Sequence, residues 1–452
     1  MASTTKIENT FLKDLGDGLI LRRATPSDGE ALAAFNHNIH RHDDTGEPDE
    51  RVAVWTRDLV ERPHPTFNVG DFTLVEDTKT GAIVSSMNLI SQVWSYAGVE
   101  FKVGRPELVG TEPTYRERGL VRAQFEVIHG WSEGRGELLQ AITGIPYYYR
   151  LFGYEMALAL GGGRAGFKPH IPRLKEGEKD PYRLRQATEA DIGFLAKLYQ
   201  LGAQRSLVSC VRDGALWRYE IAGKSARNVN RSEVRVIETL EGEPTGYLLH
   251  PPDTWGPMLA ATGYEVKPGV SWAAVTPTVI RYLEATGKSY TSEDGKQSEL
   301  EAFGFWLGAE HPVYQVIADK LPRVRKPYAW YLRVPDLPAF VRRISPVLEG
   351  RLADSPLFGH SGELKVSFYN RGLRMIFDAG RLVEVESWKP APQGHSGDAG
   401  FPGLTFLQLL FGYRSLVELQ YAFADCWTGG DEPRALLEIL FPKQASDVWP
   451  LA

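Results

Sequence analysis

A weak internal repeat restricts the fold of this 452-residue chain more than any other feature of its sequence. The pattern Leu-Arg-x-Ala-Thr-x-x-Asp occurs at 21–28 and again at 184–191, and a leucine follows each aspartate four residues later. In each copy a short apolar strand runs into a threonine that can cap a helix and an aspartate that suits its first turn. The repeat predicts two copies of one strand-to-helix module; two unrelated capping boxes are the alternative.

The length and the changing pattern of the chain indicate three domains. A chain this long exceeds one ordinary core, and each copy of the repeat is followed by enough residues for an α/β domain. Gly161–Asp180 is rich in Gly, Lys and Pro, and from Asp336 a helix, alternating strands and a helix-rich end follow. We therefore expect a mixed α/β (α+β) fold with a first domain at 1–165, a linker at 166–181, a second domain at 182–335 and a third at 336–452.

Composition excludes several classes of protein. Hydrophobic residues make up 43% and charged residues 24% of the chain, which is typical of globular proteins, and the net charge of -6 offers no basic surface for nucleic acid. The two cysteines, Cys210 and Cys426, suggest neither a disulfide framework nor a metal site. Met1–Lys13 does not resemble a signal peptide, and the apolar Leu404–Tyr413 is too short to span a bilayer. We expect a cytoplasmic protein that binds neither nucleic acid nor membrane, and the charge mildly favours a cationic substrate.

The segment with the clearest chemistry runs from Val109 to Phe125: a strand, a short basic turn and the start of a helix. Unpaired backbone N–H groups at a helix N-terminus attract anions, and Gly119 lets a ligand approach the main chain closely. Arg116, Arg118 and Arg122 add positive charge. The segment predicts a pyrophosphate site, with a solvated basic turn as the alternative.

Two motifs resemble those of the GNAT acetyltransferases. Arg116-x-x-Gly-Leu-Val121 is similar to the loop that binds the acetyl-CoA pyrophosphate, and Tyr149-Arg-Leu-Phe-Gly-Tyr154 is similar to a motif that the family places one strand downstream. The resemblance implies acetyl-CoA as co-substrate and no metal. It assigns cofactor binding to Val109, Gly110, Thr111, Glu117, Arg118, Gly119, Leu120, Val121, Arg122, Gly144 and Ile145.

The whole chain resembles the Eis (enhanced intracellular survival) group within that family. The group combines a catalytic GNAT domain, a degenerate second one and a C-terminal domain like the sterol carrier proteins. Here 182–335 lacks an Arg-x-x-Gly loop although Phe303-Gly-Phe305 echoes the terminal motif, and Ala399–Tyr413 is similar to the helix facing the group's C-terminal sheet. The resemblance implies a homo-oligomer, often a hexamer. One departure is Ala452, which stands at the end of the chain where an aromatic residue is expected.

Acetyl transfer needs a group that protonates the departing thiolate and a group that takes a proton from the attacking ammonium. A phenol has a pKa near 10, close to that of a thiol, so a tyrosine suits the role of the acid. The spacing to Phe152 selects Tyr149 among the neighbouring tyrosines. Tyr147 and Tyr148 are better explained as aromatic packing around the site.

For the base, the resemblance points to the α-carboxylate of Ala452, acting through water; its ordinary pKa of about 3.5 makes it weak. The alternatives follow the first helix: His37, His40, His42, Asp43 and Asp44. These histidines lack the spacing of the common zinc motif, so a metal is not expected.

The sequence therefore predicts an acetyl-CoA-dependent N-acetyltransferase. The acceptor would be a primary amine, such as an aminoglycoside, a polyamine or a lysine-like group, attacking directly in a ternary complex. A non-catalytic acyl-CoA-binding or lipid-binding regulator is the alternative.

Overall fold

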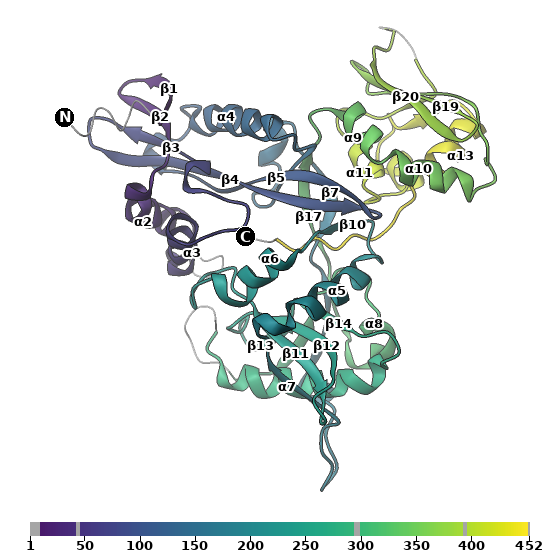
Figure 1. The fold of residues 1–452 in the computed structure, drawn as a ribbon. Helices are drawn as coiled ribbons and strands as arrows, with labels where there is room; N and C mark the ends of the chain where they lie inside the picture. The colour runs from purple at the N-terminus through teal and green to yellow at the C-terminus, as the bar shows by residue number, and fades with distance from the viewer. Residues whose placement is uncertain (1–9, 42–45, 293–298, 392–395, 451–452) are drawn as a thin grey trace.

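The computed structural model describes residues 10–41, 46–292, 299–391 and 396–450. The described chain forms three regions, each with its own sheets and helices (Figure 1), and a few strands are exchanged between the first two. Helices and strands alternate throughout, so the predicted mixed α/β class is confirmed. None of the helices in the described ranges has the length and apolarity that crossing a membrane requires.

The first region is built on a nine-stranded sheet in the order β1-β2-β3-β4-β5-β6-β17-β7, with β10 paired to β4. Its strands are β1 (Phe11–Gly16), β2 (Leu19–Arg23), β3 (Phe72–Asp77), β4 (Ala82–Tyr96), β5 (Val99–Thr111), β6 (Leu139–Ile142), β7 (Glu155–Leu160), β10 (Val208–Cys210) and β17 (Tyr328–Arg333). Helices α2 (Gly29–Ile39) and α3 (Glu50–Glu61) cover one face, and α4 (Leu120–Gly134) covers the other (Figure 1). Successive side chains of a strand point to opposite faces of the sheet, so each strand contributes to a hydrophobic core on both faces. Leu74 packs with α2 and α3, whereas Val75 packs with α4.

The repeat forms the same junction in both regions. In the first copy the Thr25 N–H and hydroxyl donate to the Asp28 carboxylate, and Arg22 pairs with Asp28 at 2.8 Å. In the second copy Thr188 donates to Asp191 in the same way, and Arg185 pairs with Asp191 at 2.7 Å. The sequence analysis assigned no role to the arginine that both copies share. In the structure this arginine forms an ion pair with the aspartate that caps the turn.

The second region has two four-stranded sheets, β14-β12-β11-β9 and β13-β15-β8-β16. Their strands are β8 (Gly163–Phe167), β9 (Tyr182–Gln186), β11 (Glu233–Thr239), β12 (Pro244–His250), β13 (Met258–Ala261), β14 (Gly263–Val266), β15 (Ala302–Phe305) and β16 (Arg323–Arg325). The helices are α5 (Ile192–Ala203), α6 (Gly214–Arg218), α7 (Trp272–Ser289) and α8 (Val313–Val316).

Three strands cross between these regions. Strand β10 comes from the chain of the second region, between its first two helices, and pairs with β4 of the first. Strand β8 pairs with β15 and β16, so residues 166 and 167 of the predicted linker already belong to a sheet of the second region. Conversely, β17 lies between β6 and β7, although 328–333 falls inside the predicted second domain. The hydrophobic pattern of a segment predicts a strand but does not show which strand it pairs with. The domain boundaries expected from the sequence therefore do not follow the exchanged strands.

The third region is a five-stranded sheet in the order β20-β19-β18-β21-β22, covered by short helices. The strands are β18 (Gly362–Ser367), β19 (Gly372–Asp378), β20 (Arg381–Trp388), β21 (Ala399–Gly400) and β22 (Trp427–Thr428). The helices are α9 (Leu337–Arg343), α10 (Ser345–Ala353), α11 (Phe406–Leu410), α12 (Leu416–Ala422) and α13 (Asp431–Leu440). Its core continues into the first region, because Trp94 and Trp330 belong to the same buried cluster as Phe340 and Phe411.

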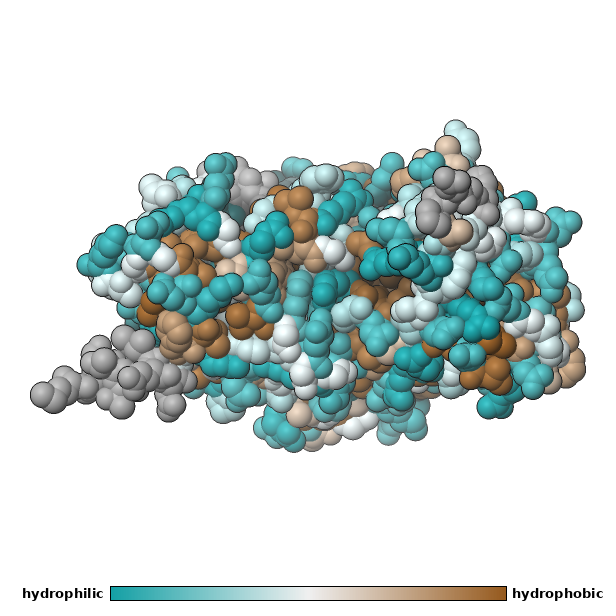
Figure 2. Space-filling model, turned by 90° about the horizontal axis from the view of Figure 1, so that it is seen from above, coloured by the Kyte–Doolittle hydropathy of each residue, from teal (hydrophilic) through white to brown (hydrophobic). Residues whose placement is uncertain are grey.

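Polar side chains cover most of the face seen from above, with small apolar patches between them (Figure 2).

Candidate active site

The site begins where β5 separates from β6. The two strands pair in parallel at Val103 and Gly104. Further along, β5 bulges at Leu108, whose φ is 51°, and the register against β4 shifts there. The edge of β5 beyond Gly104 therefore turns away from β6 and opens a gap in the sheet.

Two backbone amides point into this gap. The Glu112 N–H donates to Val84 O at 2.9 Å, so Glu112 faces β4. Because the direction of N–H groups alternates along an antiparallel strand, Gly110 also faces β4, and Val109 and Thr111 face the gap. An extended ligand can add to the sheet through these two residues.

The basic turn and helix α4 form the next part of the wall. Gly119 precedes the helix with a φ of 73°, and no heavy atom lies within 4 Å of the position that a Cβ would take there. The first N–H groups of α4 lack helical acceptors, as at any helix N-terminus. Of the arginines, Arg116 Nε donates to Thr111 O at 3.3 Å, while Arg118 pairs with Asp17 at 3.4 Å. An anion at this turn meets open space, backbone N–H groups and positive charge.

Most of the sequence-predicted cofactor residues line one cleft of about 610 Å³. They are Val109, Gly110, Thr111, Glu117, Gly119, Leu120, Val121, Arg122 and Ile145, and the proposed acid Tyr149 lies in the same wall. Arg118 and Gly144 lie outside this wall, although the Tyr149 ring passes close to Gly144. Ala452 falls outside the described residues, so its carboxylate stays a prediction.

Tyr149 lies on the short helical segment η4 (Tyr148–Phe152) and is 5% exposed. Its ring packs edge-on against Phe125 and Tyr331, and its hydroxyl makes no hydrogen bond within the described part of the chain. Burial raises its pKa, and the negative charge of Glu107 raises it further. The phenol is thus protonated at neutral pH and available as a proton donor. Its neighbour Tyr147 is 65% exposed, whereas Tyr148 lines the cleft as expected for packing.

Strand β17 supports this wall, and no sequence motif indicated that role. From β17, Tyr328 Oη donates to Gly144 O at 2.8 Å and Tyr331 Oη donates to Ile145 O at 3.4 Å. The loop between β6 and Tyr149 is therefore held by residues nearly two hundred positions later. Tyrosines in a strand usually indicate packing, and only the pairing of β17 with β6 reveals this role.

A buried ion pair lies deeper in the same sheet and was also missed. Arg105 and Glu107 form a salt bridge on one face of β5, and the Arg105 guanidinium lies 5.1 Å from the Trp330 ring centre. Burial raises the pKa of Glu107, while Arg105 opposes the shift. The sequence does carry a signal for this ion pair. Residues at positions i and i+2 of a strand lie on the same face, and two opposite charges on a buried face are expected to pair.

The histidines proposed as alternative bases lie in different places. His40 lines the cleft, and burial lowers its pKa to about 4 despite the charge of Asp49. It is therefore neutral at pH 7, and its buried Nε2 has no hydrogen-bond partner in the described ranges. His37 Nδ1 lies 3.7 Å from Glu50, away from the cleft wall. His42, Asp43 and Asp44 lie outside the described residues. No group of three or more metal-ligating side chains occurs among the residues that the structure describes.

Comparison with known proteins adds an independent result. Residues 21–157 match the family model described as "Acetyltransferase (GNAT) domain". This segment is a GNAT acetyltransferase domain. The match contains β5, the Gly119 turn, α4 and Tyr149, and with this domain the protein is an acetyltransferase. GNAT enzymes take their acyl group from acetyl-CoA. No curated protein matches the chain in sequence.

Solved structures with the same fold extend over nearly the whole chain. A probable N-acyltransferase of unknown function from Enterococcus faecalis aligns with a TM-score of 0.63 at 12% identity, over 95% of this chain and 97% of that one. A GCN5-related N-acetyltransferase from Kribbella flavida gives 0.62 at 16% identity, over 98% of both chains. Eis1 from Mycobacterium abscessus gives 0.56 at 13% identity, over 95% of this chain and 99% of that one. At these identities the likeness concerns the fold.

Proposed function

We propose that the cleft of the GNAT domain transfers the acetyl group of acetyl-CoA directly to a primary amine, with Tyr149 protonating the departing thiolate. The observation that carries the proposal is the buried Tyr149 hydroxyl, kept protonated and unbonded within the described residues, between the β5 gap and the start of α4. The site residues, the acceptor class and the mechanism all belong to this proposal.

The cofactor would lie along the two features that the cleft joins. Its pyrophosphate binds the N–H groups of Gly119–Arg122, where the helix dipole favours negative charge. Its extended arm pairs with the amides of Val109 and Thr111, and one of these N–H groups can also hold the thioester oxygen. The thioester carbonyl then lies near Tyr149.

The proposed reaction is complete with the residues of this cleft, by direct transfer and without a covalent enzyme intermediate. The amine nitrogen attacks the carbonyl carbon, and the C–S bond breaks as the tetrahedral intermediate collapses. Tyr149 Oη gives its proton to the thiolate, and the proton lost by the ammonium restores the phenol through solvent or a base. Burial keeps the phenol protonated before the reaction. Because the same desolvation also raises the pKa of the departing thiol, the proton can still pass from Tyr149 to the thiolate.

Two carboxylates compete for the basic role. Glu107 is the described one whose charge acts on Tyr149, and its raised pKa makes it a better proton acceptor than an ordinary carboxylate. Arg105 fixes it in place but also stabilises its anion. The α-carboxylate of Ala452 is the second candidate; the preceding tail reaches the same sheet, where Trp330 Nε1 donates to Val448 O at 3.1 Å.

We also propose the three-domain division at 1–165, 182–335 and 336–452, apart from the exchanged strands β8, β10 and β17, with a second GNAT-like domain that lacks catalysis and a third domain like the sterol carriers. The shared Thr-x-x-Asp junctions and the full-length fold matches support it. A homo-oligomer is part of the same proposal.

Thiol release from acetyl-CoA, measured against an aminoglycoside, a polyamine and a lysine peptide, tests the function. We expect at least one amine to raise release and to gain a single acetyl group by mass spectrometry. Tyr149→Phe should abolish most of this release, while Tyr147→Phe, which changes an exposed neighbour, serves as the matched control. Acetyl-CoA binding without thiol release for any acceptor would favour the regulatory alternative.

A further inference from the structure

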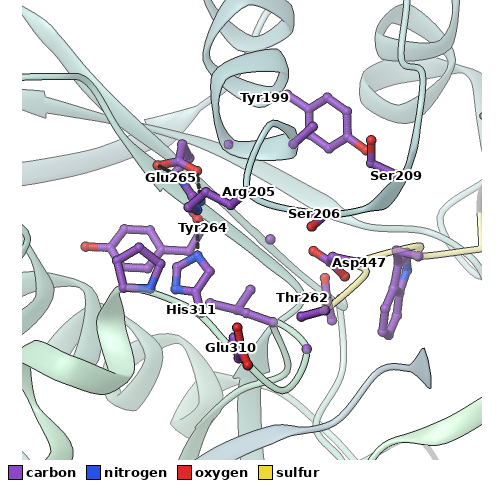
Figure 3. A pocket seen from close by; sticks show the side chains of 18 of the residues that line it. Tyr199, Arg205, Ser206, Ser209, Thr262, Tyr264, Glu265, Glu310, His311 and Asp447 are labelled. Atoms are coloured by element: carbon purple, nitrogen blue, oxygen red, sulfur yellow. Dashed lines mark hydrogen bonds and ion pairs between the residues drawn. The ribbon is translucent and has the colours of Figure 1, made fainter. Parts of the chain in front are cut away.

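The second region contains a cleft at the position that corresponds to the active site. Strand β13 pairs in parallel with β15, and after Thr262 the chain leaves this pairing and continues as β14, which pairs with β12 alone. Strand β5 separates from β6 in the same way. The cleft lies beside this point, between β14, the loop after β15 and the C-terminal tail (Figure 3).

This cleft cannot take acetyl-CoA as the first one would. It encloses about 210 Å³, against about 610 Å³ in the GNAT domain. Its wall includes no residue of 267–275, so the start of α7 does not reach it. The helix N-terminus that would hold a pyrophosphate is therefore separate from the cavity. The space fits a small molecule.

The tyrosine that follows β15 differs from Tyr149 in its hydrogen bonds. Tyr314, on α8 after β15, occupies a place like that of Tyr149, but backbone groups engage its hydroxyl. Its Oη lies 3.0 Å from Phe305 O and 3.1 Å from Gly308 O, and it accepts from the Leu307 N–H at 3.2 Å.

One cation at the cleft, Arg212, forms no ion pair within the described ranges, although the charges of Glu220 and Asp447 act on it. The Arg212 guanidinium lies 4.8 Å from the Tyr199 ring centre and 5.4 Å from that of Trp217, so stacking fixes its plane. Its Nε is buried without a hydrogen bond, and within the described ranges it forms no ion pair. By contrast, the nearby Arg205 already pairs with Glu265. Arg212 is thus available to a carboxylate, which its planar fork suits.

Two anions face the same cavity. Asp447, from the tail, and Glu310, from the loop after β15, form no ion pair with any residue that the structure describes. Burial raises the pKa of Asp447, and the charges of Arg212 and Arg205 oppose this shift. Figure 3 shows Asp447 beside Ser206 and Thr262, with Glu310 at another side of the space. The Thr262 hydroxyl is buried and has no hydrogen-bond partner in the described chain. These oxygens can accept the hydrogen bonds of an ammonium group.

We propose that this second cleft binds a small zwitterion, whose carboxylate lies on Arg212 and whose ammonium group lies among Asp447, Glu310 and the Thr262 hydroxyl. Arg212 and the two carboxylates line one small cavity, and Asp447 is near enough for its charge to interact with Arg212. A molecule that carries both charges can contact both, which a simple amine or acid cannot. Because Asp447 comes from the tail, the bound molecule would join the second region to the end of the third.

Calorimetry on the full chain with 4-aminobutyrate, butylamine and butyrate tests the proposal. We expect 4-aminobutyrate to bind more tightly than either analogue by about tenfold or more, since each lacks one charged partner. Asp447→Asn and Arg212→Gln should each weaken its binding by about tenfold, whereas Glu176→Gln, an exposed charge outside the cleft, should not. Equal binding of an analogue, or no binding of the zwitterion, would overturn the proposal.

Because 4-aminobutyrate carries a primary amine, the active site needs its own control. Binding is measured with CoA present, and the probe is checked for acetylation by mass spectrometry. Tyr149→Phe should leave the affinity for 4-aminobutyrate unchanged. Binding that survives both second-cleft substitutions would place the molecule elsewhere and contradict the proposal. Circular dichroism shows whether Arg212→Gln still folds, and Asp447→Asn decides the outcome if it does not.

Discussion

The two clefts share a backbone plan but differ in what each offers a ligand. In the GNAT domain the Tyr149 hydroxyl is unbonded in the described residues, and the start of α4 opens onto the cavity. In the second region the backbone engages the Tyr314 hydroxyl, and α7 begins away from the cavity. A strand that leaves its parallel neighbour creates an opening in both. The fold therefore provides the opening in the sheet, whereas a few side chains and the position of one helix N-terminus determine what the opening can bind and catalyse.

The largest expected effect separates the two tyrosines. Tyr149→Phe should lower kcat by about 100-fold, the size of a general-acid contribution, with little change in acetyl-CoA affinity. Tyr314→Phe should leave kcat intact but lower the free energy of unfolding by about 1–3 kcal/mol, because the Leu307 N–H loses its acceptor. Steady-state kinetics and urea unfolding measure both. Equal kinetics for Tyr149→Phe and wild type would remove the acid role.

A second prediction concerns pH. His311, in the second cleft, donates from Nε2 to Tyr264 O and accepts the Val313 N–H at Nδ1, so the fold requires the neutral ring. Burial lowers its pKa to about 3, below its unfolded value of about 6.5. The unfolded state therefore binds more protons between these values, and stability falls as the pH drops below about 6.5.

At pH 5 this linkage amounts to at most about 2 kcal/mol for one histidine. His311→Asn should therefore lose less stability than wild type between pH 7 and pH 5. His40, whose pKa burial lowers to about 4, should act with the same sign in the first cleft, so His40→Asn gives the matched comparison. Parallel pH profiles for wild type and His311→Asn in urea unfolding would contradict the assignment.

A third prediction compares two glycines that each precede a helix. Gly119 and Gly269 have φ values of 73° and 85°, and neither would place a Cβ within 4 Å of another heavy atom. Alanine at either position should therefore cost a similar strain of about 1–2 kcal/mol. Gly119→Ala alone should raise the acetyl-CoA Kd, by about tenfold, because the new methyl group fills the space that the pyrophosphate approaches. Equal affinities in the two variants, measured by calorimetry, would argue against the phosphate turn.

The smallest effect is an expected absence of change. Acetyl-CoA should bind once per chain, and Thr262→Val, which alters only the second cleft, should leave its affinity within about twofold. A calorimetric stoichiometry of two cofactor molecules per chain would show that the second region also binds it, and the contrast between the clefts would fail.

Much of the candidate site was predictable because its signals are local. The Gly119 turn, the arginines around it and Tyr149 lie within about forty residues, and helix starts and positive-φ turns leave marks in short stretches of sequence. The Thr-x-x-Asp junctions followed from the same kind of signal, and both form. The supports were not predictable: Tyr328 and Tyr331 act on Gly144 and Ile145 across the exchanged strand β17.

The sequence by itself determined the mixed α/β class, the repeated junction and the strand, turn and helix around Gly119, because local backbone preferences and hydrophobic periodicity encode them. Tertiary structure alone decided which strands are exchanged, that Arg105 pairs with Glu107 beneath the site, and that Asp447 of the tail faces the same cavity as Arg212. Such features depend on contacts between residues far apart in the chain, and the pattern of one segment carries no record of its distant partner.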